Sequence, residues 1–131
     1  MSAELIVGAL LNVNGVTALV GNRRAVSQLK QGTMMPALFY ESISKLPVLT
    51  IGMAFGPRKF MSRVQITALA ADPAGVTQVL AATMYAMNFF SGTSANKRVD
   101  LVEFIEERGI QRDNDAGIWY GQQDFMIHWY E

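Results

Sequence analysis

The single histidine of the sequence, His128, is the first residue that could do chemistry, because an imidazole is the usual general base near neutral pH. It lies in the closing run GIWYGQQDFMIHWYE. If this run is a strand, Asp124 shares its face but lies about 13 Å away at ~3.3 Å per residue, too far to orient the ring. No G-x-S-x-G elbow or similar nucleophile setting accompanies the histidine. We therefore expect a structural strand residue, no catalytic residues, and a protein that is not an enzyme.

A second candidate is the turn Asp113–Asp115, whose acidic spacing could begin a calcium-binding loop with Asp124 at the twelfth place. Gly117 stands at the fifth ligand position, Ile118 replaces the glycine of the sharp bend, and no glutamate closes the loop. A solvated hairpin turn is the better interpretation. One histidine and no cysteine exclude histidine-rich and cysteine-rich metal sites, so we expect no metal and no cofactor.

Two basic clusters could contact phosphate: Arg23–Arg24, and Arg58–Lys59 with Arg63. Few aromatic residues are interleaved with them, and Lys plus Arg equals Asp plus Glu at eleven each. There is thus no basic field to draw the protein onto nucleic acid or anionic lipid. We expect non-specific contact with a phosphate backbone at most.

The composition limits the class of protein more than these motifs do. The 131 residues fit one domain, and half of them are apolar while only 17% are charged, against ~25% in ordinary soluble domains. Some apolar surface is therefore expected to meet a partner. The amino-terminal run has no basic region, and no stretch approaches the ~20 apolar residues of a membrane span. We expect neither a signal peptide nor contact with a membrane.

The first half of the chain alternates short helices and strands. A helix capped by Ser2 is expected to stop at Asn14 and Gly15. It is followed by a second helical turn at 16–20, a polar strand at 25–31 and, after Pro36, an apolar strand at 37–44. Residues 48–51 are β-branched enough to pair, so 46–59 reads as a possible hairpin arm. The apolar positions of the first helix at helical spacing are Leu5, Ile6, Ala9, Leu10 and Val13.

The middle of the chain has the clearest pattern. From Phe60 to Ala71, a face of apolar and small residues alternates with a face that carries polar residues, which predicts a half-buried strand. Asp72 and Pro73 then form a strong helix start, with an N-cap before the one position that tolerates proline. The inward stripe of this helix is Val76, Val79, Leu80, Thr83, Met87 and Phe90.

The opposite side of this helix is the unusual feature, because no Asp, Glu, Lys or Arg occurs between Pro73 and Asn96. A helix on the surface of a monomer normally has a charged side. An uncharged outer side carrying exposed aromatic rings indicates association, so we predict that another subunit covers it. The predicted interface residues are Gln78, Ala81, Ala82, Tyr85 and Phe89.

The last third of the chain predicts strands. Residues 98–108 fit a strand with a bulge, although their apolar spacing also fits a short helix. The polar turn QRDNDAG and the closing run then form a hairpin, with Trp119, Phe125, Ile127 and Trp129 on one face. Helices at the amino end, one long helix and five or six strands predict an α+β class with one layer of helices on one sheet.

The order of these elements resembles a known family. A first helix, a short turn ending in Val20 and Gly21, a polar strand, Pro36 before an apolar strand, and then a strand, an Asp-Pro pair and a long helix are similar to the tail-completion proteins of tailed bacteriophages. These are tail-terminator or minor tail proteins, which cap the tail tube where it joins the head. The terminal strand carries the likeness at Asp124, Phe125, Ile127 and Trp129.

The resemblance implies a subunit with a mixed, mainly antiparallel sheet and helices on one face, which assembles as a ring, expected to be a hexamer. Its implied partners are the tail-tube protein and the head-connector or neck protein, with DNA passing through the bore. The implied location is the tail–head junction of a virion assembled in the cytoplasm of a bacterial host, from a virus, a prophage or a derived particle. The arm at about 46–59 would reach the tube or a neighbour; its implied contacts are Met53, Phe55, Arg58 and Lys59.

Two alternatives remain open at this point. The protein could be another neck component, such as a head-closure protein. It could also be a small α+β dimer that binds or transforms a small ligand in a pocket between sheet and helix, using His128, Tyr130 or Tyr120.

Overall fold

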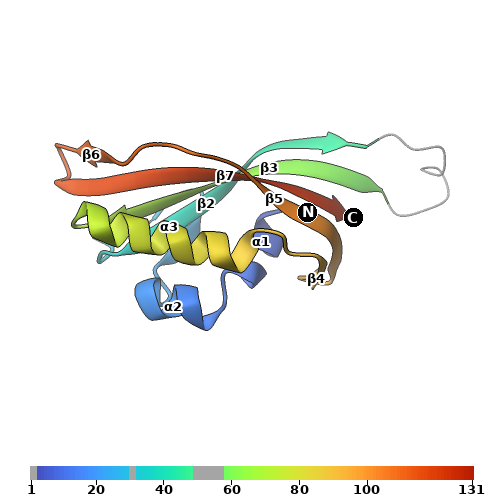
Figure 1. Cartoon of the computed structure of the whole chain (residues 1–131), viewed down its shortest axis with the longest axis horizontal. Coiled ribbons are helices and arrows are strands. Elements are labelled where there is room, and N and C mark those ends of the chain that lie inside the picture. Colours follow the sequence, from blue (N-terminus) through green and yellow to red (C-terminus); the bar gives the residue numbers. More distant parts are fainter. Residues whose placement is uncertain (1–2, 30–31, 49–57) are drawn as a thin grey trace.

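The computed structural model describes residues 3–29, 32–48 and 58–131. One seven-stranded sheet carries three helices on a single face, which confirms the predicted α+β class (Figure 1). The helices are α1 (Glu4–Leu10), α2 (Asn14–Val20) and α3 (Pro73–Met87). The strands are β1 (Arg24–Val26), β2 (Ala37–Pro47), β3 (Lys59–Ala70), β4 (Gly92–Ser94), β5 (Lys97–Glu107), β6 (Gln111–Asp113) and β7 (Ile118–Tyr130).

The strand order is β1-β2-β3-β7-β5-β4, with β6 also paired to β7. Only β1 and β2 are parallel; the other pairs are antiparallel, so the sheet is mixed and mainly antiparallel as expected. The segment 98–108 is a strand, and its pairing with β7 shifts register twice, between Val99 and Leu101 and between Phe104 and Glu106. This confirms the bulged strand and excludes the helix.

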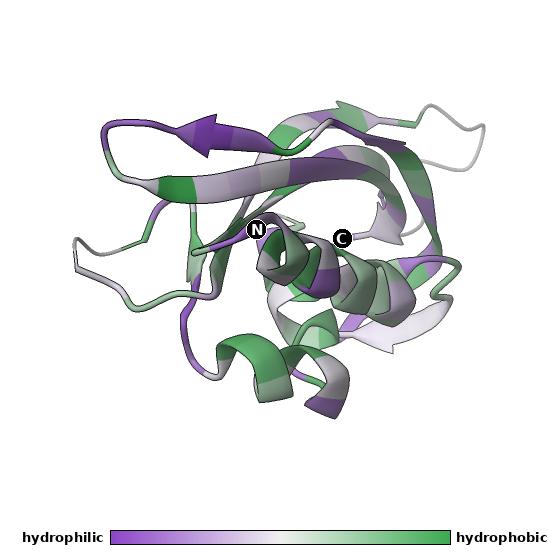
Figure 2. Cartoon of the chain, turned by 60° about the vertical axis from the view of Figure 1, so that its left-hand side comes forward, coloured by the Kyte–Doolittle hydropathy of each residue, from purple (hydrophilic) through white to green (hydrophobic). Residues whose placement is uncertain are grey.

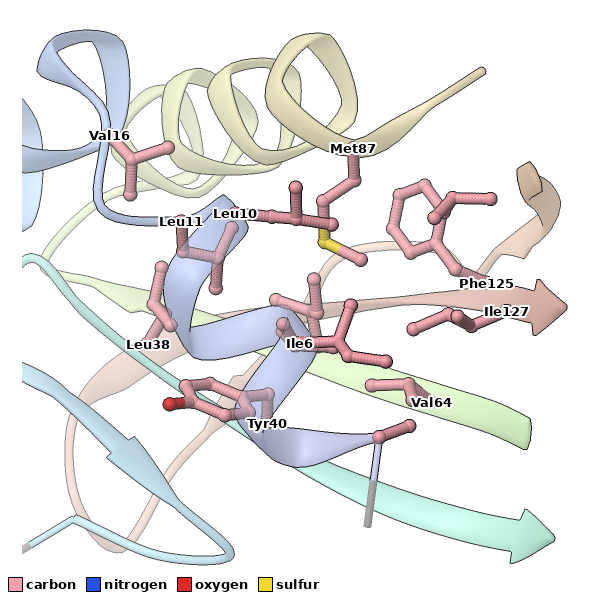
Figure 3. Close-up of a cluster of buried hydrophobic side chains, with 14 of the residues drawn as sticks. Ile6, Leu10, Leu11, Val16, Leu38, Tyr40, Val64, Met87, Phe125 and Ile127 are labelled. Atoms are coloured by element: carbon pink, nitrogen blue, oxygen red, sulfur yellow. The ribbon is translucent and has the colours of Figure 1, made fainter. Parts of the chain in front are cut away.

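The alternation predicted for β3 is observed. The face of β3 that begins at Phe60 is buried, and the neighbouring β7 contributes Phe125, Ile127 and Trp129 to the same side of the sheet. The helices cover this side, and Figure 3 shows side chains from α1, α3 and the strands meeting in one cluster. By contrast, β6 is hydrophilic along its whole length (Figure 2).

Helix α3 begins as predicted. The Asp72 carboxylate accepts a hydrogen bond from the Gly75 N–H at 2.8 Å, and Pro73 occupies the first turn. The helix crosses β7 at Gly121, where a Cβ atom would lie 2.9 Å from Val76 Cγ1 and 3.0 Å from Leu80 Cδ1. Glycine at this position therefore allows the helix to approach the sheet closely.

The apolar stripe predicted for the first helix is correct only at Ile6 and Leu10, which are buried. Leu5, Ala9 and Val13 are exposed, whereas Val7 and Leu11 are buried completely. The helix has only seven residues and is packed against both β2 and α3, so its buried side is broader than one stripe. Leu11 lies just after the helix, where helical periodicity no longer applies.

Two segments of the first half differ from their predicted limits. The polar strand expected at 25–31 is the three-residue β1, because Ser27 adopts a positive φ of 68° and its N–H donates to the Tyr40 carbonyl. Strand β2 continues three residues past the predicted end, to Pro47, and the Val48 N–H donates to the Lys59 carbonyl at 2.9 Å. The base of the expected arm is thus a hairpin; residues 49–57, with Met53 and Phe55, lie outside the described residues.

Candidate functional site

The outer side of α3 is the most unusual surface of the described chain. The five inner helix positions that were predicted to be buried, Val76 to Met87, are buried. On the other side Tyr85 is 94% exposed and Phe89 is 76% exposed. Gln78 and Ala81 are also exposed, while Ala82 is half-buried and packs against the core. In the single chain, four of the five predicted interface residues therefore face outward.

This side of the helix is hollowed. A depression of about 460 Å³ is lined by Ala81, Met84, Tyr85, Asn88 and Phe89, which we call the α3 patch. A second depression of about 240 Å³ shares Ala81 and Met84 and extends to Glu107, the last residue of β5, and to Ile110 in the connection to β6. The α3 patch therefore lies on the β5 side of the helix. Met84 and Asn88 were not predicted as part of it, although both lie within one turn of Tyr85.

The backbone around Phe89 is fixed to the edge of the sheet. The Phe89 N–H donates to the Val102 carbonyl at 2.8 Å, and the Val102 N–H donates to the Phe90 carbonyl at 2.9 Å. The Asn88 side chain accepts a hydrogen bond from the Phe104 N–H. Phe89 itself has a φ of 65°, in the left-handed region that bulky residues rarely adopt. These bonds hold its ring outward, while the Phe90 side chain packs against the core.

The other face of the sheet carries charged residues that pair with one another. The buried Asp124 carboxylate accepts hydrogen bonds from Arg63 Nε at 2.9 Å and from Arg108 Nη1 and Nη2 at 3.0 Å. Burial alone would raise the pKa of Asp124, but the two guanidinium groups outweigh it and hold the pKa below its usual value. Glu106 joins the same network through both arginines. The cluster is neutralised within the chain and stabilises the pairing of β3, β7 and β5.

Replacing Asp124 by asparagine should lower the free energy of unfolding by about 2 kcal/mol at pH 7. We place the loss below that of a fully buried ion pair because Arg63 and Arg108 are partly exposed. A carboxyl with a lowered pKa stabilises the fold above its unfolded pKa of about 3.9 and loses this effect as the pH falls through its folded pKa. Urea unfolding at pH 7 and pH 3 measures both effects. An equal deficit at both pH values would contradict the prediction; Asp115→Asn, on the exposed turn, is the control.

His128 lies on this charged face and not beneath the helices. Its Nε2 is 2.8 Å from a carboxylate oxygen of Glu103 on β5. Tyr120 bonds to Gln111, and Tyr130 stacks with Arg98, on the same side of β7. The pocket between sheet and helix that was considered for a small ligand therefore does not contain these three side chains. Within the described residues, no group of three or more His, Cys, Asp or Glu side chains could hold a metal ion.

The arginines of the first basic cluster are bound within the chain. Arg23 donates to the carbonyls of Pro36 and Leu19, and Arg24 donates to those of Gly21 and Leu11. Three of these four carbonyls belong to the carboxyl ends of α1 and α2, where cations complement unpaired carbonyl groups. The cluster stabilises the helix ends, a role that its position after two short helices could have indicated.

The second basic cluster lies at the base of the arm. Lys59 pairs with Asp100 at 3.0 Å, and Arg63 is part of the Asp124 network, whereas the Arg58 side chain is exposed. The hydrogen bond from Lys59, more than any other influence, lowers the pKa of Asp100. Of the two described arm residues predicted to contact a partner, Arg58 is thus the one that points outward.

Comparison with solved structures shows which fold this is. A chain from the virion of a native gene transfer agent particle superposes with a TM-score of 0.69 at 13% identity, over 98% of this chain and 97% of that one. This structural similarity shows that the two chains share a fold. A second solved structure, whose printed name gives no function, has a TM-score of 0.59 at 14% identity and covers 100% of this chain and 96% of its own. No protein-family model and no curated protein sequence matches the chain.

No helix among the described residues is both long and apolar enough to cross a membrane.

Proposed function

We propose that this protein is a structural component of a phage-like virion, without enzymatic activity, that forms a ring on the end of the tail tube. The ring ends tube polymerisation and joins the tube to the head connector. The observation that carries the proposal is the outer side of α3 and the turn after it, where Tyr85 and, two residues past the end of the helix, Phe89 are exposed in a stretch without Asp, Glu, Lys or Arg. A patch of this kind is buried in the working form of a protein.

The fold supports the same proposal. The structural neighbour with a TM-score of 0.69 is part of a virion particle, and the match spans nearly all of both chains. Fold alone does not fix a function, so the proposal combines this likeness with the exposed surface.

In this proposal each subunit buries its α3 patch against the next subunit around a closed circle, expected to contain six copies. One rim of the ring binds the last layer of the tail-tube protein, and the other binds a head-connector or neck protein. DNA passes through the bore without being gripped, in keeping with a net charge of zero. The protein would be located at the tail–head junction, after assembly in the host cytoplasm.

Electron microscopy of particles made with and without the protein tests this role. A tail terminator controls tube length, so particles lacking it should carry tails of widely varying length and few joined heads. Tails of normal length with unjoined or leaking heads would instead indicate a head-closure protein. Unchanged particles would contradict both roles.

A further inference from the structure

The two adjacent arginines at the start of β1 carry charge that no carboxylate neutralises. Arg23 and Arg24 are half-buried, and no ion pair among the described residues joins either guanidinium group to a carboxylate. The other two half-buried arginines, Arg63 and Arg108, both pair with Asp124. Arg23 and Arg24 are thus partly withdrawn from water without a negatively charged side chain to balance them.

The helix ends that these arginines contact compensate only part of their charge. The carboxyl end of a helix is equivalent to about −0.5 elementary charge, so α1 and α2 together supply about −1. A guanidinium group is always ionised at neutral pH, so the two arginines together bring about +2. An excess of about +1 therefore remains at this place, and such an excess attracts an anion.

The hydrogen bonds of the two arginines leave donors for that anion. Arg23 donates through Nε and Nη2, and Arg24 donates through Nε and Nη1, to backbone carbonyls at 2.9 to 3.2 Å. A guanidinium group has more N–H donors than these bonds use, and its planar fork holds the remaining ones in a fixed geometry. Both side chains are therefore anchored on one side, with their other donors already oriented.

A depression of about 280 Å³ lies at these arginines. A water molecule takes ~30 Å³ in the liquid, so the depression has room for one phosphate group together with several waters. Asn22 and Thr33 contribute side chains that can also donate hydrogen bonds. The residues that line the depression are Asn22, Arg23, Arg24, Ala25, Leu29 and Thr33.

We propose that this depression binds a phosphate group, held by the forks of Arg23 and Arg24. Guanidinium groups match the oxygens of a phosphate in pairs, and a phosphate offers more acceptor oxygens than a carboxylate does. A free phosphate ion and the backbone of DNA share this chemistry. The site lies next to β1, at the opposite edge of the sheet from β5 and β4, so it does not depend on the α3 patch or on self-association.

Nuclear magnetic resonance of the natural protein, titrated with inorganic phosphate at pH 7 and low salt, tests the site. The backbone signals of residues 22–25 and the Nε–H signals of both arginines should shift and saturate, with a Kd on the order of 1 mM. Acetate should need about tenfold more for the same shifts, because it offers fewer acceptor oxygens. Duplex DNA in place of phosphate identifies the source: shifts of the same signals assign the site to a phosphate backbone, and shifts with inorganic phosphate alone assign it to a free anion.

The variant Asn22→Asp is the sharpest test, because it adds a negative charge to the lining of the depression while both arginines keep their bonds to the helix ends. Asn22 is exposed, so the variant should fold, and it should bind phosphate about tenfold more weakly. Asn114→Asp makes the same change on the exposed β6–β7 turn and should leave phosphate binding unchanged. If Asn22→Asp does not fold, Arg23→Lys keeps the charge but loses the fork, and it should weaken binding as well.

Three results would overturn the proposal. Shifts that do not saturate would show that no site exists. Equal shifts at the exposed Arg58 and Arg112 would show that phosphate meets any cation of the surface. Unchanged phosphate binding by a folded Asn22→Asp variant would place the anion elsewhere.

Discussion

Replacing Phe89 by asparagine should leave the subunit folded and weaken its self-association about 30-fold or more. Asparagine tolerates the left-handed backbone that Phe89 adopts, so the hydrogen bonds to Val102 remain and some strain is relieved. The isolated subunit should therefore be as stable as the natural one, or about 0.5–1 kcal/mol more stable. Losing an aromatic anchor at the centre of an interface typically costs 2 kcal/mol or more of binding free energy.

Sedimentation equilibrium measures the association, and thermal unfolding of the dilute protein measures the stability. Val13→Asn is a matched control, because Val13 is a partly exposed apolar residue at the N-cap of α2 and does not line the α3 patch. It should leave the association unchanged. Natural association of the Phe89→Asn variant would show that the ring of Phe89 is not used, and an unfolded variant would show that the ring belongs to the core.

Replacing Trp129 by alanine should have the largest effect on stability, about 4 kcal/mol. The indole is completely buried, its Nε1 donates to the Ser62 hydroxyl at 2.9 Å, and its ring packs against Phe60. Truncation would leave a large cavity and a buried hydroxyl without its partner. Urea unfolding measures the loss.

The adjacent residue provides the matched control for this experiment. His128→Ala removes a partly exposed contact with Glu103 and should cost less than about 1 kcal/mol. A similar loss from both variants would contradict the view that the terminal strand is built around its inward aromatic residues. Loss of a catalytic activity in the His128 variant alone would support the alternative that the protein is an enzyme.

The sequence predicted best where one pattern repeats over many residues. In β3, eleven of the twelve residues alternate between a buried and a half-buried face, and the exception is Thr67, which is buried on the otherwise half-buried face. Helix α3 was equally predictable, because Asp72 and Pro73 define its start and a full stripe defines its inner side. The uncharged outer side of α3 could be predicted from the same stripe together with the absence of Asp, Glu, Lys and Arg.

Short elements were predicted less well because tertiary contacts decide them. The buried side of α1 depends on three neighbours, β2, α3 and β4, and no seven-residue helix encodes all of them in its spacing. Likewise, the acceptors of Arg23 and Arg24 are backbone carbonyls, so only the position of these arginines after two short helices, and no pairing of residue types, could have indicated their role.

Some features of the candidate site could not be predicted from the spacing of residues in the sequence. Tyr85 and Phe89 could be identified because they lie in an uncharged stretch of the chain, although α3 ends at Met87 and Phe89 follows it. The positive φ of Phe89 arises from its hydrogen bonds to β5, a strand that follows it in the chain.

The most direct test of the account is the mass of the purified, natural protein in solution, measured by light scattering over a wide range of concentration. If a sister copy covers the outer side of α3, the mass should rise with concentration to a defined multiple of one chain, expected to be six. A mass of one chain at every concentration, with Tyr85 and Phe89 left in water, would contradict the central claim.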